Sequence, residues 1–368
     1  PSPVLGCVAG SGFEDRPELL SQIAERWPLL GNDTETVARI KSVNFFDTLD
    51  GLGIPHPRTQ TEPPLGEEWL TKRRGAAGGS HIAPYMPSTS TPASRDNFPD
   101  AYFQERVKGL AVSALFVGNG RDACVLGFSE QWTDPSPASP FRYGGAARPA
   151  SLSAKLQDEI TASVLKASAA FKLKGLGSAD FIVVDDTGTA LLLEINPRPG
   201  ATLDIFGEET QPLLKLHLDA VLDGKLPSSP LALEDAMASA IVYAPERLII
   251  TEDMAWPDWV ADRPKPRESI DKNRPICTVF ARAETKARAK TRFWPKPAQK
   301  QGASVTSGDH KLTKNSGLPS VNGLVEPLVE ALIRDAAALR VEVSKGSLGE
   351  TRIDCGVKAI GGVEAGRR

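Results

Sequence analysis

The feature that most constrains this chain is an apolar strand that runs into regularly spaced polar residues. Residues 191–200 read LLLEINPRPG, so Glu194 ends the apolar run, Asn196 follows two positions later and Arg198 two further on. Alternate residues of a β-strand point to the same face, so these three side chains converge if the strand continues that far. Two oxygen ligands and one cation suit Mg²⁺ together with the phosphate groups that share its coordination. The segment therefore predicts a metal and phosphate site at the end of a strand.

A second carboxylate is expected to join this site from the preceding strand. Residues 179–184 and 190–195 are mainly apolar, and the DDTG sequence between them is typical of a tight turn. Pairing of these strands as a hairpin would place Asp180 opposite or close to Glu194. Two facing carboxylates repel each other unless a cation lies between them, so the pair favours a metal site. The alternative is that Glu194 and Arg198 form a structural ion pair and Asp180 only caps a strand.

A glycine-rich loop provides a second indication of phosphate binding. Residues 69–82 read WLTKRRGAAGGSHI, in which a strand carries Lys72 into a loop with Gly75, Gly78 and Gly79. Glycines allow backbone N–H groups to approach phosphate oxygens, and Lys72 would neutralise part of their charge. The loop matches neither GxxxxGKS/T nor GxGxxG and leads to a strand, which argues against a P-loop and a dinucleotide-binding fold. A flexible hairpin without a ligand is the alternative interpretation.

The remaining patterns predict an α+β protein. Strands are expected at 102–106, 110–117 and 123–131, the last two joined by a GNG turn, and helices at 151–171 and 209–222. Successive strands with short turns favour antiparallel sheets, with the helices packed on one face. The first of these strands can offer backbone groups to an adenine ring, although an ordinary sheet strand is the simpler interpretation.

Composition excludes several classes of protein. The 368 residues carry a net charge of -3, so no global attraction to nucleic acid or to an anionic membrane is expected. No apolar run is long enough to span a bilayer, and the four cysteines are scattered without a CxxC pair, which argues against a zinc site and a disulfide framework. No signal peptide is visible and the chain does not begin with Met, so we expect a cytoplasmic protein whose true start was processed or lost.

The order and spacing of the glycine loop, the QER strand and the D…EINPR pair resemble those of the ATP-grasp superfamily over about residues 30–225. The resemblance implies an ATP-grasp fold, in which two α+β subdomains grip ATP. It also implies an activity, in which a carboxylate takes the γ-phosphate to give an acyl phosphate and an amine then displaces it. Positioning and charge neutralisation dominate such phosphoryl transfer. The implied partners are small-molecule carboxylate and amine substrates, with no nucleic acid and no membrane, and a homodimer, the form of many members.

The resemblance assigns roles to individual residues by position, with ATP and Mg²⁺ or Mn²⁺ as the implied cofactors. Arg198 resembles the cation that stabilises the acyl phosphate. Lys41 lies near a second lysine of the family but is offset by about one residue, so its role stays open. His81 is favoured as a surface residue of the loop rather than a phosphate contact. The other histidines show no partner spacing and are expected to be structural or exposed: His56, His217 and His310. The implied metal ligands are Asp180, Glu194 and Asn196, and the implied ATP contacts are Lys72, Gly75, Gly78, Gly79, Ser80, His81, Gln104, Glu105 and Val107.

Two further resemblances give a metabolic context. Residues 262–264 and 275–279, with the SGFEDRP segment near the start, resemble ATP-grasp proteins of methylotrophic bacteria that accompany the tetrahydromethanopterin-linked one-carbon pathway. Residues 319–368 resemble the beginning of methenyltetrahydromethanopterin cyclohydrolase, and no cyclohydrolase activity is expected from so short a fragment. The pairing implies a ligase in the biosynthesis of tetrahydromethanopterin or methylofuran, which carry amide-linked glutamate-type units. The alternatives are a cyclohydrolase fused to the ATP-grasp part and truncated here, and an ATP-binding scaffold without ligase activity.

These patterns predict a division of the chain into five parts. Between the ATP-grasp region and the end, Lys and Arg mix with Gly, Ser, Pro and Gln, which is typical of a flexible linker; a basic nucleic-acid tail is the less favoured alternative. Amphipathic helical spacing returns at 322–340. The predicted parts are a pre-grasp region (1–60), an ATP-grasp domain (61–225), a family-specific extension (226–285), the basic linker (286–318) and a truncated cyclohydrolase-like fragment of small α/β fold (319–368).

Overall fold

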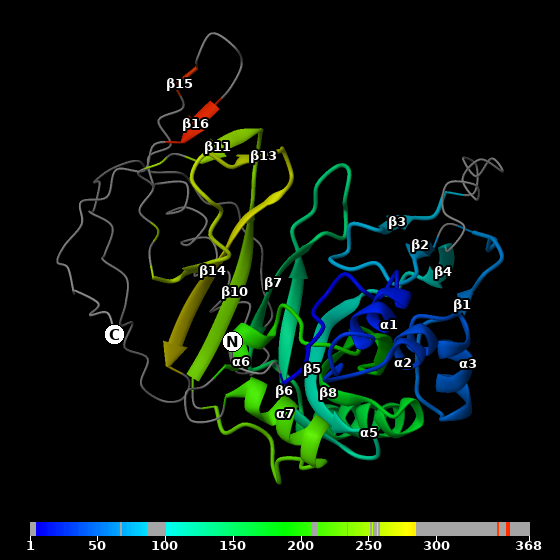
Figure 1. Cartoon of the computed structure of the whole chain (residues 1–368). Helices are drawn as coiled ribbons and strands as arrows, with labels where there is room; N and C mark the ends of the chain where they lie inside the picture. The colour runs from blue at the N-terminus through cyan, green and yellow to red at the C-terminus, as the bar shows by residue number, and fades with distance from the viewer. Residues whose placement is uncertain are drawn as a thin grey trace, which may run out of the picture.

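The computed structural model describes residues 5–284, apart from 67, 87–100, 208–211, 234, 251, 253–255 and 257, together with 344–345 and 351–353. Within these residues the protein is a mixture of helices and mainly antiparallel sheets, as the sequence predicts (Figure 1). No helix among the described residues combines the length and the apolar character needed to cross a bilayer. The helices are α1 (Glu18–Ala24), α2 (Thr34–Ile40), α3 (Asn44–Gly51), α5 (Ala154–Phe171), α6 (Leu203–Phe206) and α7 (Leu213–Asp223).

An eight-stranded antiparallel sheet forms the body of the molecule, with the strand order β12-β14-β10-β7-β6-β5-β8-β9. The predicted hairpin of β5 and β6 is present. In its turn the Asn119 side chain accepts hydrogen bonds from the backbone N–H groups of Arg121 and Asp122. The strands β7 and β12 have no counterpart in the sequence prediction. The strands are β5 (Gly109–Asn119), β6 (Ala123–Thr133), β7 (Tyr143–Arg148), β8 (Lys174–Val184), β9 (Ala190–Asn196), β10 (Asp235–Tyr243), β12 (Val260–Ala261) and β14 (Pro275–Glu284).

Helices cover both faces of this sheet, so the expectation of helices on one face is wrong. Along β5, Ala114 and Phe116 pack into a core with α5 and the α2–α3 pair, whereas Leu115 and Val117 pack against α6 and α7. Neighbouring residues of a strand point to opposite faces, so β5 is buried on both sides. The physical reason is visible in its composition, because residues 110–117 are apolar except for Ser113.

Side-chain caps fix where the helices that flank the site begin. Asp33 accepts a hydrogen bond from the backbone N–H of Thr36 and starts α2, and Ser153 accepts one from Leu156 and starts α5. Such caps satisfy backbone donors that have no partner within the helix. Because α2 ends at Ile40, the next residue, Lys41, is held at the turn between α2 and α3.

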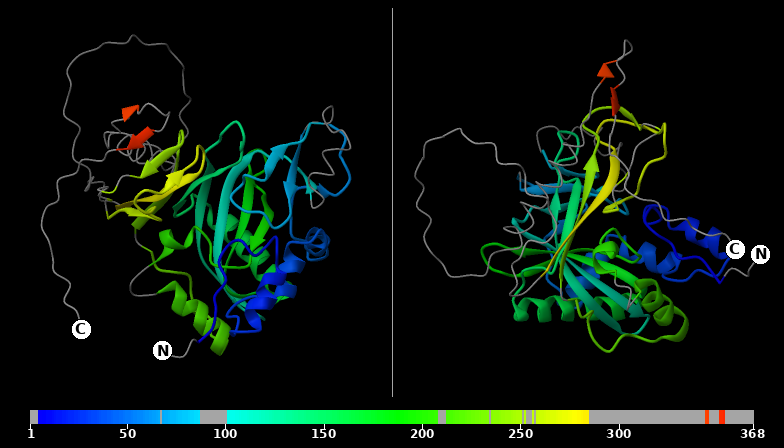
Figure 2. Two further views of the ribbon diagram at one scale, coloured as in Figure 1. Left: turned by 45° about the horizontal axis from the view of Figure 1, so that its top comes forward. Right: turned by 90° about the vertical axis from the view of Figure 1, so that its left-hand side faces the viewer.

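A smaller sheet, the lid sheet, stands beside α2 and α3 with the strand order β1-β4-β2-β3. Trp69, Tyr85 and Phe103 form a small separate core within it. Figure 2 shows the lid sheet and the strands β10 and β14 at opposite ends of the molecule, with the body of the main sheet between them. The two α+β parts expected for an ATP-grasp fold are therefore present. The lid strands are β1 (Thr59–Gln60), β2 (Trp69–Arg73), β3 (Ile82–Pro84) and β4 (Ala101–Glu105).

Within the predicted extension, 226–285, β10 and β14 continue the main sheet next to β7. A third sheet has the order β13-β11-β16-β15, in which β16 runs parallel to β11. The five-part division itself stays a prediction, and the linker, the helix at 322–340, His310 and most of the C-terminal fragment lie outside the described residues. The third sheet consists of β11 (Leu248–Ile250), β13 (Ser269–Ile270), β15 (Ser344–Lys345) and β16 (Thr351–Ile353).

Candidate active site

Two carboxylates face each other across the β8–β9 hairpin. Asp180 pairs in register with Glu194, as the hairpin predicts, and Asn196 lies two residues further along β9. The Asn196 side-chain amide donates to Asp180 Oδ2 at 3.1 Å and to Glu194 Oε1 at 3.4 Å. On the neighbouring strand, Ser113 donates its hydroxyl to Asp180 Oδ1 at 2.6 Å. The three predicted metal ligands are thus gathered at one point of the sheet.

A bulge in β9 shapes the same place. The register shifts between Asp180 and Phe181, so that Leu193 has no partner opposite it. A bulge turns a side chain away from strict alternation, which explains how the neighbours Leu193 and Glu194 both line one cavity.

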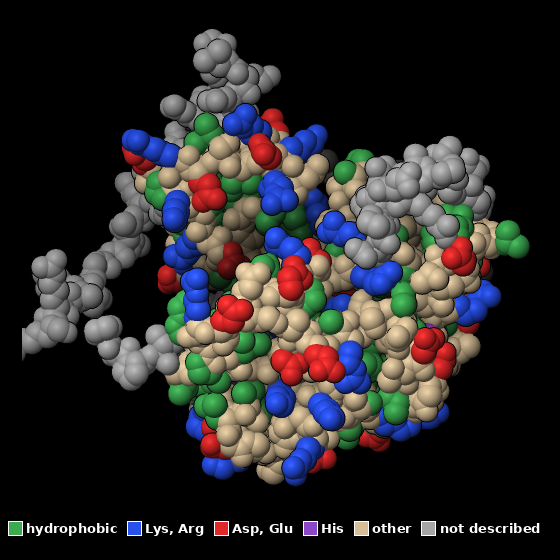
Figure 3. Space-filling model, turned by 45° about the vertical axis from the view of Figure 1, so that its right-hand side comes forward, with side chains coloured by type: hydrophobic (Ala, Val, Ile, Leu, Met, Phe, Trp, Pro, Cys, Tyr) green, Lys and Arg blue, Asp and Glu red, His purple; other side chains and the backbone are tan. Residues whose placement is uncertain are grey.

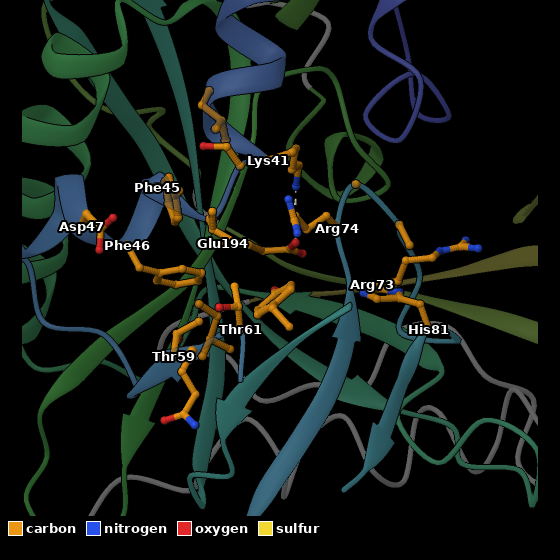
Figure 4. Close-up of a pocket in the computed structure, with 18 of the residues that line it drawn as sticks. Lys41, Phe45, Phe46, Asp47, Thr59, Thr61, Arg73, Arg74, His81 and Glu194 are labelled. Atoms are coloured by element: carbon orange, nitrogen blue, oxygen red, sulfur yellow. Dashed lines mark hydrogen bonds and ion pairs between the residues drawn. The ribbon is translucent and has the colours of Figure 1, made fainter. Parts of the chain in front are cut away.

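Lys41 supplies the cation of this cluster. Its Nζ lies 3.4 Å from Glu194 Oε2 and 3.3 Å from Asn196 Oδ1, and its side chain is only 9% exposed. The sequence left the role of this lysine open, and its place at the turn after α2 brings it to the carboxylates (Figure 4). The signal that could have identified it is a lysine that follows a capped helix and precedes an apolar helix and the GIPHP turn.

Lys72 approaches from the lid sheet. It is buried, and its Nζ donates to Gln104 Oε1 at 2.6 Å across the β2–β4 pair. Burial lowers the pKa of Lys72, while the nearby charges of Glu194 and Asp180 oppose that shift. Gln104, expected at the adenine, therefore uses its side chain to hold this lysine.

Burial and mutual repulsion set the protonation of the two carboxylates. Burial raises the pKa of Asp180, and the charge of Glu194 beside it adds to the shift, bringing it to about 7. Burial also acts to raise the pKa of Glu194, but the positive charges of Lys41 and Lys72 outweigh it and hold that pKa at about 2. Glu194 is thus held in its ionised form, and its charge disfavours ionisation of Asp180. A cation placed between the two carboxylates would relieve this repulsion.

These side chains fit a divalent cation that is shared with phosphate. Among the described residues no three His, Cys, Asp or Glu side chains gather as a complete ligand set. Mg²⁺ is commonly held by one or two carboxylates and takes its remaining oxygens from phosphates and water. Asp180, Glu194 and the Asn196 amide oxygen match that partial set.

The glycine loop between β2 and β3 is packed tightly at two of its glycines. Gly75, Gly78 and Gly79 all have positive φ, of 67°, 73° and 73°. A Cβ on Gly75 would lie 2.3 Å from the backbone oxygen of Glu14, and one on Gly79 would also clash, with the backbone oxygen of Phe141. Gly78 has open space around it, so its requirement for glycine is purely conformational.

His81 lies in this loop but not at the surface, which corrects the favoured expectation. It is half-buried, lines the cavity described below, and its Nδ1 is buried without a hydrogen-bond partner among the described residues. Burial lowers its pKa, opposed by the charge of Glu194. Ser80, beside it, is exposed.

A cavity of about 460 Å³ lies between the lid sheet and the α2–α3 pair and reaches Glu194. Figure 4 shows its two sides, with Phe45 and Phe46 on one and Arg73 and His81 on the other. In Figure 3 a hollow opens beside the lobe that carries β11 and β13, with Lys and Arg side chains around it. An aromatic wall opposite a basic wall can accommodate a nucleoside and its phosphates respectively. The lining residues include Lys41, Phe45, Phe46, Thr59, Thr61, Arg73, Arg74, Gly75, His81, Tyr102, Leu193 and Glu194.

The predicted hinge residues Glu105 and Val107 are not among those that line this cavity. Arg58 binds the Glu105 carboxylate through Nε at 3.0 Å and Nη2 at 2.9 Å. The Glu105 N–H also donates to the Arg58 carbonyl. Tyr102, on the same strand, faces the cavity instead, and the hinge residues lie at the connection from β4 to β5.

Arg198 pairs with a residue that the sequence did not single out. Strand β9 ends at Asn196, so the convergence of three side chains along one strand is not realised for Arg198. Its Nε donates to Glu14 Oε1 at 2.5 Å, and both side chains are nearly buried. The alternative of a structural Glu194–Arg198 pair is therefore wrong, because Glu194 pairs with Lys41. Arg198 remains near the site, since its charge acts on Asp180.

Comparisons with known proteins agree with this fold. Residues 41–202 match the family model of the ATP-grasp domain, so the chain contains an ATP-grasp domain. The fold is similar to the biotin carboxylase domain of Hydrogenobacter thermophilus 2-oxoglutarate carboxylase, solved with MgADP and bicarbonate (TM-score 0.60, 12% identity, 74% of this chain and 68% of that one). It is also similar to N5-carboxyaminoimidazole ribonucleotide synthetase of Thermus thermophilus (TM-score 0.55, 19% identity, 74% and 76%). At these identities the likeness shows the fold.

The C-terminal end matches a different family. Residues 320–368 match the cyclohydrolase (MCH) model. Over 51 residues the chain is 61% identical to methenyltetrahydromethanopterin cyclohydrolase of Methylobacterium sp. (strain 4-46), which is 14% of this chain. The chain spans about 15% of the length of that curated relative.

Proposed function

We propose that this chain is an ATP-dependent carboxylate–amine ligase. The observation that carries the proposal is the cluster of Asp180, Glu194 and Asn196 with Lys41 and Lys72. Two of its members, Lys41 and Glu194, line the cavity. Phosphoryl transfer from ATP needs concentrated positive charge around the phosphates and oxygen ligands for the metal. Both are gathered here from three separate parts of the fold.

The chemistry would proceed in two displacements. An oxygen of the acid substrate attacks the γ-phosphorus, the bond from that phosphorus to the β–γ bridging oxygen breaks, and ADP leaves. The amine nitrogen then attacks the acyl carbon, the carbon–oxygen bond to phosphate breaks, and the amine loses a proton. Asp180, Glu194 and Asn196 would hold a divalent metal, which would supply neutralisation of the phosphate charge.

The residues of the chain would divide the remaining tasks. Lys41 and Lys72 would contact the triphosphate from opposite sides, one from the helical part and one from the lid sheet. The glycine loop, with Ser80 and His81, would cover the phosphates and exclude water, which strengthens every electrostatic contact inside. Arg198 would bind the acyl phosphate oxygens.

Calorimetry with MgATP tests the site directly. The wild type should bind, and Glu194→Gln, which keeps the shape but removes one charge, should weaken binding at least tenfold. Asp186→Asn is the matched control, because Asp186 is an exposed residue in the turn of the same hairpin. Absence of binding by the wild type, or equal binding by Glu194→Gln, would refute the proposed site.

The substrate context is a finer proposal that rests on the C-terminal match. We propose that the amide bond made by this ligase belongs to a cofactor of one-carbon metabolism, tetrahydromethanopterin or methylofuran. The reason is that the relative matched at the C-terminal end is named methenyltetrahydromethanopterin cyclohydrolase. ADP release should be screened with glutamate as a candidate acid and with pterin-bearing and furan-bearing amines. Turnover with unrelated acids alone would refute this assignment and leave the ligase activity standing.

Two further points complete the proposal. A homodimer is supported by the Hydrogenobacter neighbour, which is described as a dimer, and light scattering in solution would test it. A cyclohydrolase activity is the competing function, favoured only by the match of residues 320–368. Hydrolysis of a methenyl pterin by this chain would support that alternative.

A further inference from the structure

The segment that precedes α1 carries a buried acid whose contacts serve two parts of the site. Glu14 Oε2 accepts the backbone N–H groups of Gly12 at 2.9 Å and Phe13 at 3.2 Å, which folds the segment around its own carboxylate. The other oxygen, Oε1, accepts Nε of Arg198 at 2.5 Å. The Glu14 side chain is 3% exposed and that of Arg198 is 12% exposed. A buried acid with three donors holds its partner in one orientation.

The main chain of the same residue contacts the glycine loop. Only a residue without a Cβ can sit at position 75, because that Cβ would lie 2.3 Å from the Glu14 oxygen and 2.6 Å from the Asp15 Cα. Gly75 lies directly after Arg73 and Arg74, which line the cavity. Residues 12–15 therefore contact the glycine loop through their backbone, and they contact Arg198 through the side chain of Glu14.

Arg198 is oriented by this contact but not saturated by it. Nη1 donates to the carbonyl of Pro199 at 3.3 Å. This bond and the one from Nε to Glu14 are the hydrogen bonds that Arg198 forms within the described residues, and neither of them uses Nη2. A guanidinium that is fixed through Nε can present its remaining N–H groups to a carboxylate or a phosphate in a defined direction.

We propose that residues 12–15 are a latch in which Glu14 positions Arg198 for the acid substrate and at the same time holds the glycine loop closed. This assignment rests on the proposed ligase function. Glu14 is a positioning residue, because it acts through Arg198 and through the backbone at Gly75. Occupation of Arg198 by an acid and closure of the loop over ATP are then coupled by one short segment, which would favour phosphoryl transfer only when both substrates are present.

Two pairs of variants separate the latch from a general loss of structure. Gly75→Ala and Gly78→Ala impose the same penalty of positive φ, but only the first places a methyl group against Glu14. Glu14→Ala removes the Arg198 partner and Glu14→Gln keeps a hydrogen-bond acceptor. Asp15→Asn is the control for charge, because the Asp15 side chain is 40% exposed and lies 3.9 Å from Arg16 Nε.

The first readout needs no substrate. Trypsin cleaves after Arg73 and Arg74, so the rate of cleavage at these two bonds, followed by mass spectrometry, reports how often the loop opens. We expect Gly75→Ala and Glu14→Ala to raise this rate at least fivefold over the wild type. Gly78→Ala and Asp15→Asn should stay within twofold, and Glu14→Gln should lie between these variants and Glu14→Ala, because its amide oxygen can accept from Arg198 Nε but its amide NH2 cannot accept from the Gly12 and Phe13 N–H groups. Equal rates for Gly75→Ala and Gly78→Ala, with wild-type rates for Glu14→Ala, would overturn the latch.

The second readout uses turnover. Glu14→Ala should raise the KM for the acid at least tenfold, while Glu14→Gln restores most of the affinity because it keeps an acceptor for Nε. An unchanged KM for the acid in Glu14→Ala would refute the positioning of Arg198. If no acid gives ADP release and MgATP does not bind, the proposed function fails, and the cleavage rates still decide whether the latch exists. A global loss of fold in Glu14→Ala would appear as a lowered melting temperature, and Gly75→Ala then carries the test.

Discussion

Removal of the Lys41 charge tests whether this lysine binds the phosphates of ATP. The substitution Lys41→Met keeps most of the stem that packs beside Ile40 and the cavity, and removes only the ammonium group. Nζ lies 3.4 Å from Glu194 Oε2, and unit charges at that distance attract by about 5 kcal/mol at an effective dielectric of about 20. Desolvation of the lysine, 9% exposed, offsets much of this attraction.

The net effect on folding should therefore be small, whereas the effect on the nucleotide should be large. Glu194 is 38% exposed, so solvent screens the pair, and we expect the free energy of unfolding to fall by no more than about 1–2 kcal/mol. A charge-assisted hydrogen bond to phosphate contributes about 1.5–3 kcal/mol, which corresponds to a loss of roughly 10- to 150-fold in affinity for MgATP.

Isothermal calorimetry at low ionic strength measures this loss, with thermal unfolding in parallel. Lys155→Met is the matched control, because Lys155 is 85% exposed and forms an i,i+4 pair with Glu159 on α5. If Lys41→Met binds MgATP within twofold of the wild type, the assignment of Lys41 to the phosphates is wrong. A large loss of stability with unchanged affinity would show instead that Lys41 is a structural counter-ion of Glu194.

Three further outcomes follow from other parts of the structure. His217 accepts the Leu176 N–H through Nδ1 and donates from Nε2 to the Leu30 carbonyl, and burial lowers the pKa of His217. Its contribution to stability should therefore be present above the unfolded pKa of about 6.5 and be lost as the pH falls below that value, by up to about 1.4 kcal/mol per pH unit. The substitution His217→Gln should reduce this slope in acid denaturation curves. Phe116→Ala, at a fully buried position on β5, should lower the free energy of unfolding by about 3–5 kcal/mol in urea titrations. Chelation with EDTA should abolish ADP release while leaving the melting temperature of the nucleotide-free protein within about 1 °C, and a large destabilisation would indicate a structural metal.

The hairpin that carries the carboxylates was predictable because its contacts are local. Two mainly apolar runs, residues 179–184 and 190–195, with a short turn between them, are sufficient to bring Asp180 opposite Glu194. The glycine loop was also visible, since positive φ at Gly75, Gly78 and Gly79 selects for that residue type.

The sequence also contained a sign of the burial of β5 on both faces that its interpretation missed. A strand with one exposed face alternates between apolar and polar residues, and residues 110–117 do not alternate. The helix pattern at 209–222 then belonged to the second face, where α7 packs.

The order and spacing of motifs in the sequence indicated an ATP-grasp domain through a resemblance, and residues 41–202 match that family model. The sequence by itself also determined the antiparallel hairpin with its two carboxylates and the glycine-rich loop, because each of these depends on residues close together in the chain. Only the tertiary structure decided that Lys41 neutralises Glu194, that Arg198 pairs with Glu14, and that His81 is drawn into the cavity. The first two of these contacts join residues 153 and 184 positions apart. The sequence around a charged residue does not predict its ion-pair partner, because the partner depends on how sheets and helices pack and on the free-energy cost of burying an unpaired charge.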